Sequence, residues 1–158
     1  MIRTLMFAAV SAAALLLSPI AFAQQTGGTA DEAKAMLMKA VAAVKADKAK
    51  ALDMFNKGKG GFLDRDLYVF CATISDGKTV ALGNPNAKQL LGTDGRTLKD
   101  ATGKEFGKEL YAGYQKPEGE ITEVNYMFPR PGADKTPVAK IAFATKVSDL
   151  GCGVGYYK

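Results

Sequence analysis

Polar and apolar positions alternate along the chain with two different periods, and each period predicts one kind of element. Between residues 29 and 57 apolar side chains recur three or four positions apart, while lysines occupy the other face. This spacing predicts one long amphipathic helix, which begins at a capping box of Thr29 with Glu32 and ends at Gly58. Such a helix would be about 40 Å long. A small domain cannot cover all of it, so either one end overhangs or the helix pairs with a second copy in a homodimer.

Shorter runs with a period of two follow the helix and predict strands. The run at 68–74 is rich in aromatic and β-branched residues, and the Asp76-Gly77 turn after it predicts a hairpin. A loop with Asn-Pro and Asp-Gly turns leads to a short helix, whose start is predicted at a second capping box of Thr102 with Glu105. Three more strands are expected at 121–128, 138–147 and 151–157.

The order of these elements predicts an α+β fold. We expect a long N-terminal helix and a five-stranded antiparallel sheet, with a short helix in the connecting loop and the helices gathered on one face. The glycine-rich stretch at 57–62 follows a helix and lacks the Gly-Lys-Ser/Thr of a phosphate loop, so we interpret it as a hinge.

Residues 1–23 have the pattern of a secretory signal peptide. Arg3 precedes an apolar run at 5–17, which is short for a bilayer crossing of about 20 residues. Ala21-Phe22-Ala23 fits a cleavage signature, so we expect cleavage after Ala23, a flexible tail at 24–28 and one domain at 29–158, exported to the periplasm. The alternative is an N-terminal anchor that is not cleaved.

Composition excludes several classes of function. The 158 residues contain neither histidine nor tryptophan. Without histidine, Ser-His and Cys-His catalysis and imidazole metal sites are impossible. We therefore expect neither an enzyme nor a metal site, and no cofactor. The formal net charge is +5, but the lysines are scattered rather than interleaved with aromatic residues, which argues against nucleic-acid binding.

The chain has two cysteines, Cys71 and Cys152. In an oxidising compartment such a pair predicts one disulfide, and the alternative is two buried free thiols. The bridge would close a loop of roughly 80 residues, for which the chain-entropy model allows at most ~4–5 kcal/mol.

Several motifs, taken in order, resemble the single Cache domain, an extracytoplasmic PAS-like sensor module. They are DLYVFC at 66–71, NPNAKQLLG at 84–92, LKDATGKEF at 98–106, NYMFPRPG at 125–132 with Lys140 after it, and GCGVGYY at 151–157. The resemblance covers about residues 30–157. Two positions depart from it, since Phe128 stands where the family usually has tryptophan and Gly83 where histidine is common. The resemblance implies a free-standing, exported Cache protein without an output domain.

The resemblance also implies a pocket for a small ligand on one face of the sheet, and family members bind small organic acids, amino acids or similar metabolites. Rings and hydroxyls would line it, with cations for a carboxylate. The candidate ligand-binding residues are Tyr68, Phe70, Asn84, Tyr126, Phe128, Arg130 and Lys140.

Each candidate has a plainer alternative. Phe70 and Phe128 are also ordinary core residues, Asn84 precedes a proline in a turn, and Arg130 between two prolines can simply decorate a rigid corner. Lys140 lies inside a predicted strand and shares a face with small residues. A buried lysine without a partner is costly, so we expect Glu123, Asp100 or a ligand beside it.

The sequence leaves two main functions. The first is a periplasmic sensor protein that captures a small organic acid, or a related metabolite, for a membrane-bound receptor or kinase. The second is a structural or assembly protein of the cell envelope, in which the pocket is filled by its own side chains. An enzyme is disfavoured, because histidine is absent and no acidic pair has useful spacing.

Overall fold

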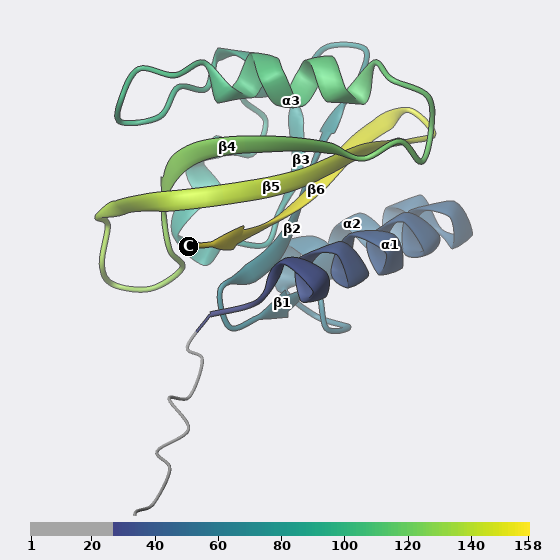
Figure 1. The fold of residues 1–158 in the computed structure, drawn as a ribbon. Helices are drawn as coiled ribbons and strands as arrows, with labels where there is room; N and C mark the ends of the chain where they lie inside the picture. The colour runs from purple at the N-terminus through teal and green to yellow at the C-terminus, as the bar shows by residue number, and fades with distance from the viewer. Residues whose placement is uncertain (1–26) are drawn as a thin grey trace, which may run out of the picture.

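The fold is a single antiparallel sheet with helices on both of its faces (Figure 1). The computed structural model describes residues 27–158. The predicted signal peptide and the tail as far as residue 26 lie outside the described residues. The prediction that the helices gather on one face is wrong: α1 and α2 lie against one face and α3 covers the other.

The N-terminal helical region consists of two helices, α1 (Ala30–Ala46) and α2 (Lys48–Lys57), rather than one. The predicted capping box of Thr29 with Glu32 is present, and Gly58 ends α2 in a left-handed conformation with φ of 62°. The break falls at Asp47, whose backbone is extended and whose carboxylate accepts a hydrogen bond from the Lys50 N–H at 3.0 Å. Asp47 is thus the N-cap of α2, a role that aspartate fills well. Both helices pack on the sheet, α1 mainly against the last two strands of the chain and α2 against the third.

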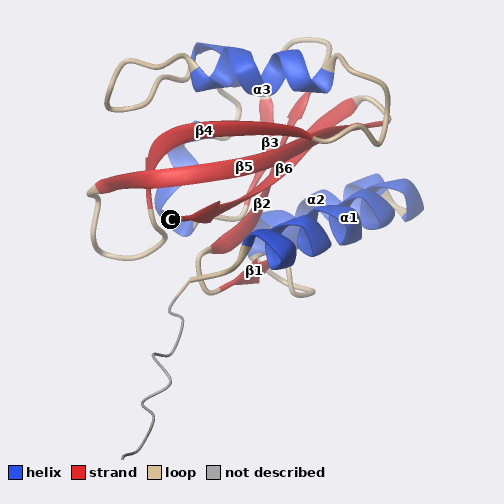
Figure 2. Ribbon diagram, viewed as in Figure 1, coloured by secondary structure: helices blue, strands red, loops and turns tan. Residues whose placement is uncertain are grey.

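The sheet has six strands, not the five that were predicted. They are β1 (Leu63–Asp64), β2 (Leu67–Thr73), β3 (Thr79–Leu82), β4 (Thr122–Pro129), β5 (Pro137–Val147) and β6 (Leu150–Tyr157). The order across the sheet is β1-β2-β6-β5-β4, and β3 also pairs with β2 (Figure 2). The additional strand, β1, has two residues, too few to show an alternating pattern.

The short helix α3 (Phe106–Tyr114) begins later than its predicted capping box. Its N-cap, Glu105, makes no side-chain capping bond, so that prediction is wrong. The carboxylate of Asp100 instead organises the turn, since it accepts hydrogen bonds from the backbone N–H groups of Thr102 at 2.8 Å and Met127 at 2.9 Å. These bonds, together with a hydrogen bond from the Thr102 hydroxyl, which is the largest cause, lower the pKa of Asp100 to about 2. They also attach the loop before α3 to β4.

Cys71 and Cys152 form a disulfide between the two central strands. They are directly opposed in the register of β2 with β6, with their Cα atoms 4.1 Å apart. Both are buried in the core under α1 and α2, on the opposite face of the sheet from α3. The bridge therefore fixes the centre of the sheet.

Among residues 27–158, no helix has both the length and the apolar character needed to cross a bilayer. The same residues contain no group of three or more carboxylates and thiols arranged to hold a metal ion.

Removing the disulfide should destabilise the fold without changing its topology. For a double Cys71→Ala, Cys152→Ala variant of the chain from residue 24 we expect a loss of about 2–4 kcal/mol in the free energy of unfolding, because the 81-residue loop is no longer closed in the unfolded state. Urea unfolding with and without reductant measures it. Reductant should destabilise the wild type and leave the variant unchanged, and equal stability of the two proteins would contradict the account.

Candidate functional site

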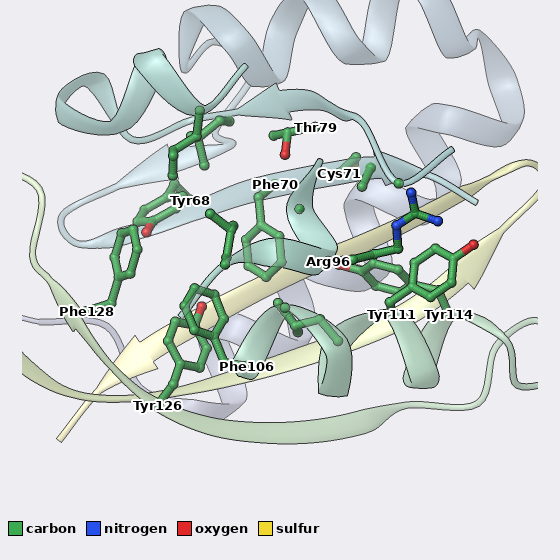
Figure 3. Close-up of a pocket in the computed structure, with 18 residues that line it drawn as sticks. Tyr68, Phe70, Cys71, Thr79, Arg96, Phe106, Tyr111, Tyr114, Tyr126 and Phe128 are labelled. Atoms are coloured by element: carbon green, nitrogen blue, oxygen red, sulfur yellow. The ribbon is translucent and has the colours of Figure 1, made fainter. Parts of the chain in front are cut away.

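A cavity of about 60 Å³ lies between α3 and the sheet. That volume is room for a few water molecules. Its walls are mostly aromatic and aliphatic, and they contain one cation, Arg96, and no carboxylate. Figure 3 shows Tyr68, Phe106, Tyr126 and Phe128 gathered at one end and Arg96, Tyr111 and Tyr114 at the other.

Three glycines of β6 make space for the side chains under this cavity. A Cβ atom on Gly151 would lie 2.0 Å from the Tyr114 ring, one on Gly153 2.4 Å from the Phe70 ring, and one on Gly155 2.4 Å from Lys140 Cε. Alternate residues of a strand share a face. The motif GCGVGYY thus leaves a bare track about 13 Å long along β6, on which these three side chains lie.

Lys140 is the largest charged group inside the protein. It lies on β5, and its relative exposure is 1%. Its ammonium donates a hydrogen bond of 2.7 Å to the Tyr68 hydroxyl. It lies 4.0–5.8 Å from the centroids of five aromatic rings, which we call the aromatic cage: Tyr68, Phe70, Tyr126, Phe128 and Tyr157. Four of the five rings also line the cavity, so Lys140 lies directly behind its wall.

Burial lowers the pKa of Lys140, because the charged form loses its hydration, and the nearby Tyr68 and Asp66 only partly oppose this effect. Neither Glu123 nor Asp100, the expected partners, hydrogen-bonds to it: Asp100 holds the turn before α3, and Glu123 is exposed. The prediction of an acidic partner on those residues is wrong. The cage takes that role, since ring faces attract a cation within about 6 Å.

The Tyr126 side chain is buried in the stack of rings under α3. Its ring stacks on Phe106 with centroids 4.1 Å apart, and its relative exposure is 7%. Within residues 27–158 the hydroxyl of Tyr126 makes no hydrogen bond. Elsewhere in the same residues, Thr122 Oγ1 is the one fully enclosed polar side-chain atom that lacks a hydrogen-bond partner. Burial, with the neighbouring Tyr68, raises the pKa of Tyr126, so it stays protonated and able to donate.

Arg130 is bound to a buried carboxylate at the edge of the same region. Its guanidinium forms an ion pair with Asp66 and lies 4.8 Å from the centroid of Tyr157, a ring of the aromatic cage. Asp66 also accepts a hydrogen bond of 2.7 Å from the Gly28 N–H, at the start of α1. Near the cage, Lys140 and Asp66 are thus buried, and the half-exposed Arg130 pairs with Asp66 from the surface.

The structure brings some of the predicted ligand residues together and leaves others outside. Tyr68, Phe70, Tyr126 and Phe128 line the cavity. Lys140 lies behind its wall, and Arg130 is committed to Asp66.

Asn84 is buried away from the cavity. Its side-chain oxygen caps the 3₁₀ helix η1 (Pro85–Leu90) by accepting a hydrogen bond from the Asn86 N–H at 2.9 Å. The alternative interpretation of Asn84, a turn former before a proline, therefore describes its structural role.

Sequence reasoning did not place α3 or the loop before it in the site. Phe106, Leu110 and Tyr114 are buried on the face of α3 that packs on the sheet, and they form one wall of the cavity. Arg96, on the 3₁₀ helix η2 (Gly95–Thr97), lies at the cavity end marked by Tyr111 and is bound to Asp94, which raises the pKa of the guanidinium. The Asp-Gly turn before Arg96 was visible in the sequence, but nothing local predicts that it folds back on the β2–β3 hairpin, where the Gly95 N–H donates to the Gly77 oxygen at 2.9 Å.

The sequence matches a known family. The sequence matches the family described as "Single Cache domain 2" over residues 9–157, so the chain belongs to the single Cache domain family, as its motifs predict. No curated protein matches it as a relative.

Solved structures share the fold. A methyl-accepting chemotaxis protein from Vibrio parahaemolyticus RIMD 2210633 is 23% identical with a TM-score of 0.62, over 80% of this chain and 86% of that one. A periplasmic sensor domain of a chemotaxis protein is 22% identical with a TM-score of 0.59, over 80% and 88%. A Cache chemosensory domain, described as a basis for carboxylic acid recognition, is 23% identical with a TM-score of 0.57, over 80% and 86%.

The glycine track is testable by adding one methyl group. Gly155→Ala should cost about 1–3 kcal/mol in the free energy of unfolding, because its Cβ atom would overlap Lys140 Cε and the backbone oxygen of Ile141 lies only 3.0 Å away. Ala139→Val, at an exposed position of neighbouring β5, is the control and should stay within about 0.5 kcal/mol. Urea unfolding compares them, and equal effects would contradict the proposed packing.

Proposed function

We propose that this chain is an exported, non-catalytic sensor domain that binds a small carboxylate in the cavity under α3. The predicted signal peptide would deliver it to the periplasm, where a membrane-bound receptor or kinase would respond to its ligand state. One observation carries the proposal: the Lys140 ammonium is buried behind the cavity wall with no carboxylate hydrogen-bonded to it.

The charges around the cage favour an anion. Among residues 27–158 Asp66 is the one buried carboxylate, and it already accepts hydrogen bonds from the half-exposed Arg130 and from Gly28, which leaves the buried Lys140 without an ion-pair partner. A ligand carboxylate would supply the missing negative charge. The Tyr68 hydroxyl accepts a hydrogen bond from Lys140 and also interacts with the Tyr157 hydroxyl, and the Tyr126 hydroxyl can donate to a ligand carboxylate. In such a site Lys140 acts largely through Tyr68 and through its electric field.

The size of the cavity limits the ligand. At about 60 Å³ it suits an acid with a short carbon chain, whose apolar part would contact Phe70 and Leu110. The membership of the single Cache family and the fold shared with chemotaxis sensor domains support a sensor role. The carboxylic acid recognition ascribed to one of those structures agrees with the charge at Lys140.

Binding should stabilise the protein, and Lys140 should be needed for it. For the chain from residue 24, a carboxylate such as acetate, propionate or pyruvate at 100 times its dissociation constant should add ~2.7 kcal/mol, a rise in Tm of roughly 5–10 °C. Lys140→Met keeps the volume and removes the charge, so the shift should disappear. A thermal-shift titration measures both effects.

Lys146→Ala is the matched control, because it removes a half-buried lysine six positions along the same strand. Its Tm shift should equal that of the wild type. If a broad panel of carboxylates shifts neither protein while both remain folded, the sensor proposal fails and a structural role in the envelope replaces it.

The lowered pKa of Lys140 predicts a pH dependence of stability. In the unfolded chain the lysine regains its ordinary pKa of 10.5, so between the lowered pKa and 10.5 the unfolded state binds more protons and stability rises with pH. Lys140→Met removes this dependence. At pH 7 the variant should be at least as stable as the wild type, because it buries no charge, and its advantage should shrink towards pH 10.

Urea unfolding of both proteins at several pH values from 7 to 10 tests this prediction. The difference in the free energy of unfolding between the two proteins reports the titration of Lys140 alone, since the buried tyrosines are present in both. A constant difference across that range would show that Lys140 titrates as an exposed lysine does.

A further inference from the structure

The aromatic cage has the composition of a receptor site for an organic cation, yet its occupant is the protein's own Lys140. The ammonium lies 4.0 Å from the centroid of Tyr68 and 5.0–5.8 Å from those of Tyr157, Phe128, Phe70 and Tyr126. Cages of this kind recognise choline and methylated lysine through the negative faces of the rings. Here the rings stabilise a resident cation, and the ammonium has one hydrogen-bond partner, Tyr68.

We propose that Lys140, as the resident cation of this cage, is the specificity-determining residue of the site: it excludes ligands that carry an ammonium and so selects simple carboxylates over amino acids. This selection rests on the proposed function. The inference that Lys140 occupies a latent cation site is independent of the proposed function, because it follows from the aromatic cage alone.

Two features of the cavity support the selection. An amino acid whose carboxylate lay beside Tyr68 and Tyr126 would place its ammonium one carbon away, close to Lys140, where the two positive charges repel each other. The cavity walls contain no aspartate or glutamate to balance that second cation, and their one charged residue is Arg96. The cage rings cannot compensate, since they already surround Lys140.

The packing also shows what removing the side chain would leave. Gly155 lies under Lys140 Cε and has no side chain to fill the space. A Lys140→Ala variant keeps Cβ and loses three carbons and the ammonium, so it would hold a void lined by the five rings, of the size of a propylammonium ion. Such a void should bind a primary alkylammonium in place of the missing side chain. Lys140→Met, which fills the same space with a neutral chain, should bind none.

The test combines ligand pairs with these variants. Isothermal titration of the wild type compares propionate with alanine and acetate with glycine, pairs that differ by the amino group. We expect each acid to bind at least tenfold more tightly than its amino acid. Thermal-shift titration of Lys140→Ala with n-propylammonium chloride should raise its Tm, whereas Lys140→Met and the wild type should show no shift.

The outcomes separate the two proposals. If no carboxylate binds the wild type but n-propylammonium stabilises Lys140→Ala, the proposed function fails and the cation cage stands. If carboxylates bind and alanine binds as well as propionate, the selection by Lys140 is wrong. If Lys140→Ala is folded and n-propylammonium does not stabilise it, the cage inference is overturned. A Lys140→Ala protein that folds only with n-propylammonium present would support it.

Discussion

The burial of one ammonium group organises the site of this protein. Lys140 lies on β5, between the strands that supply the rings around it, so its position depends on the register of β4, β5 and β6. Burying a charge without a paired carboxylate costs free energy unless other groups replace its hydration. Five ring faces and the Tyr68 hydroxyl do so here. The cost that remains, visible as the lowered pKa, can be relieved by an anion.

The two faces of the sheet are packed differently. Under α1 and α2 the apolar core and the disulfide join the central strands tightly. Under α3 the same strands carry glycines on β6 and rings on β2 and β4, which leaves the cavity open. Through Asp66, the edge of the cage is also connected to the Gly28 N–H at the start of α1.

The sequence predicted those features that depend on local spacing. The alternating runs predicted β2 to β6, and four of the proposed ligand residues, Tyr68, Phe70, Tyr126 and Phe128, line the cavity. The break at Asp47 was missed, because the helical period of apolar residues continues through it and aspartate is acceptable both inside a helix and as its cap. The side on which α3 packs was also missed. Both faces of β2 are largely buried, so its pattern does not distinguish them.

The partners of the charged residues could not be predicted, because they come from distant parts of the chain. Asp66, which binds Arg130, is 64 positions away from it, and Tyr68 is 72 positions from Lys140. Rings that look like ordinary core residues one at a time become a cage only when three strands bring them around one lysine. Their number and their distances from Lys140 are properties of the register, not of any single motif.

The most direct test is the pKa of Lys140 itself, followed by NMR of the chain labelled with ¹³C,¹⁵N-lysine, with Lys140→Met to assign the signal. Without ligand the pKa should lie below the ordinary value of 10.5. Saturating propionate should raise it, because a neighbouring negative charge favours the protonated form. A Lys140 that titrates near 10.5 and does not respond to any carboxylate would contradict the account.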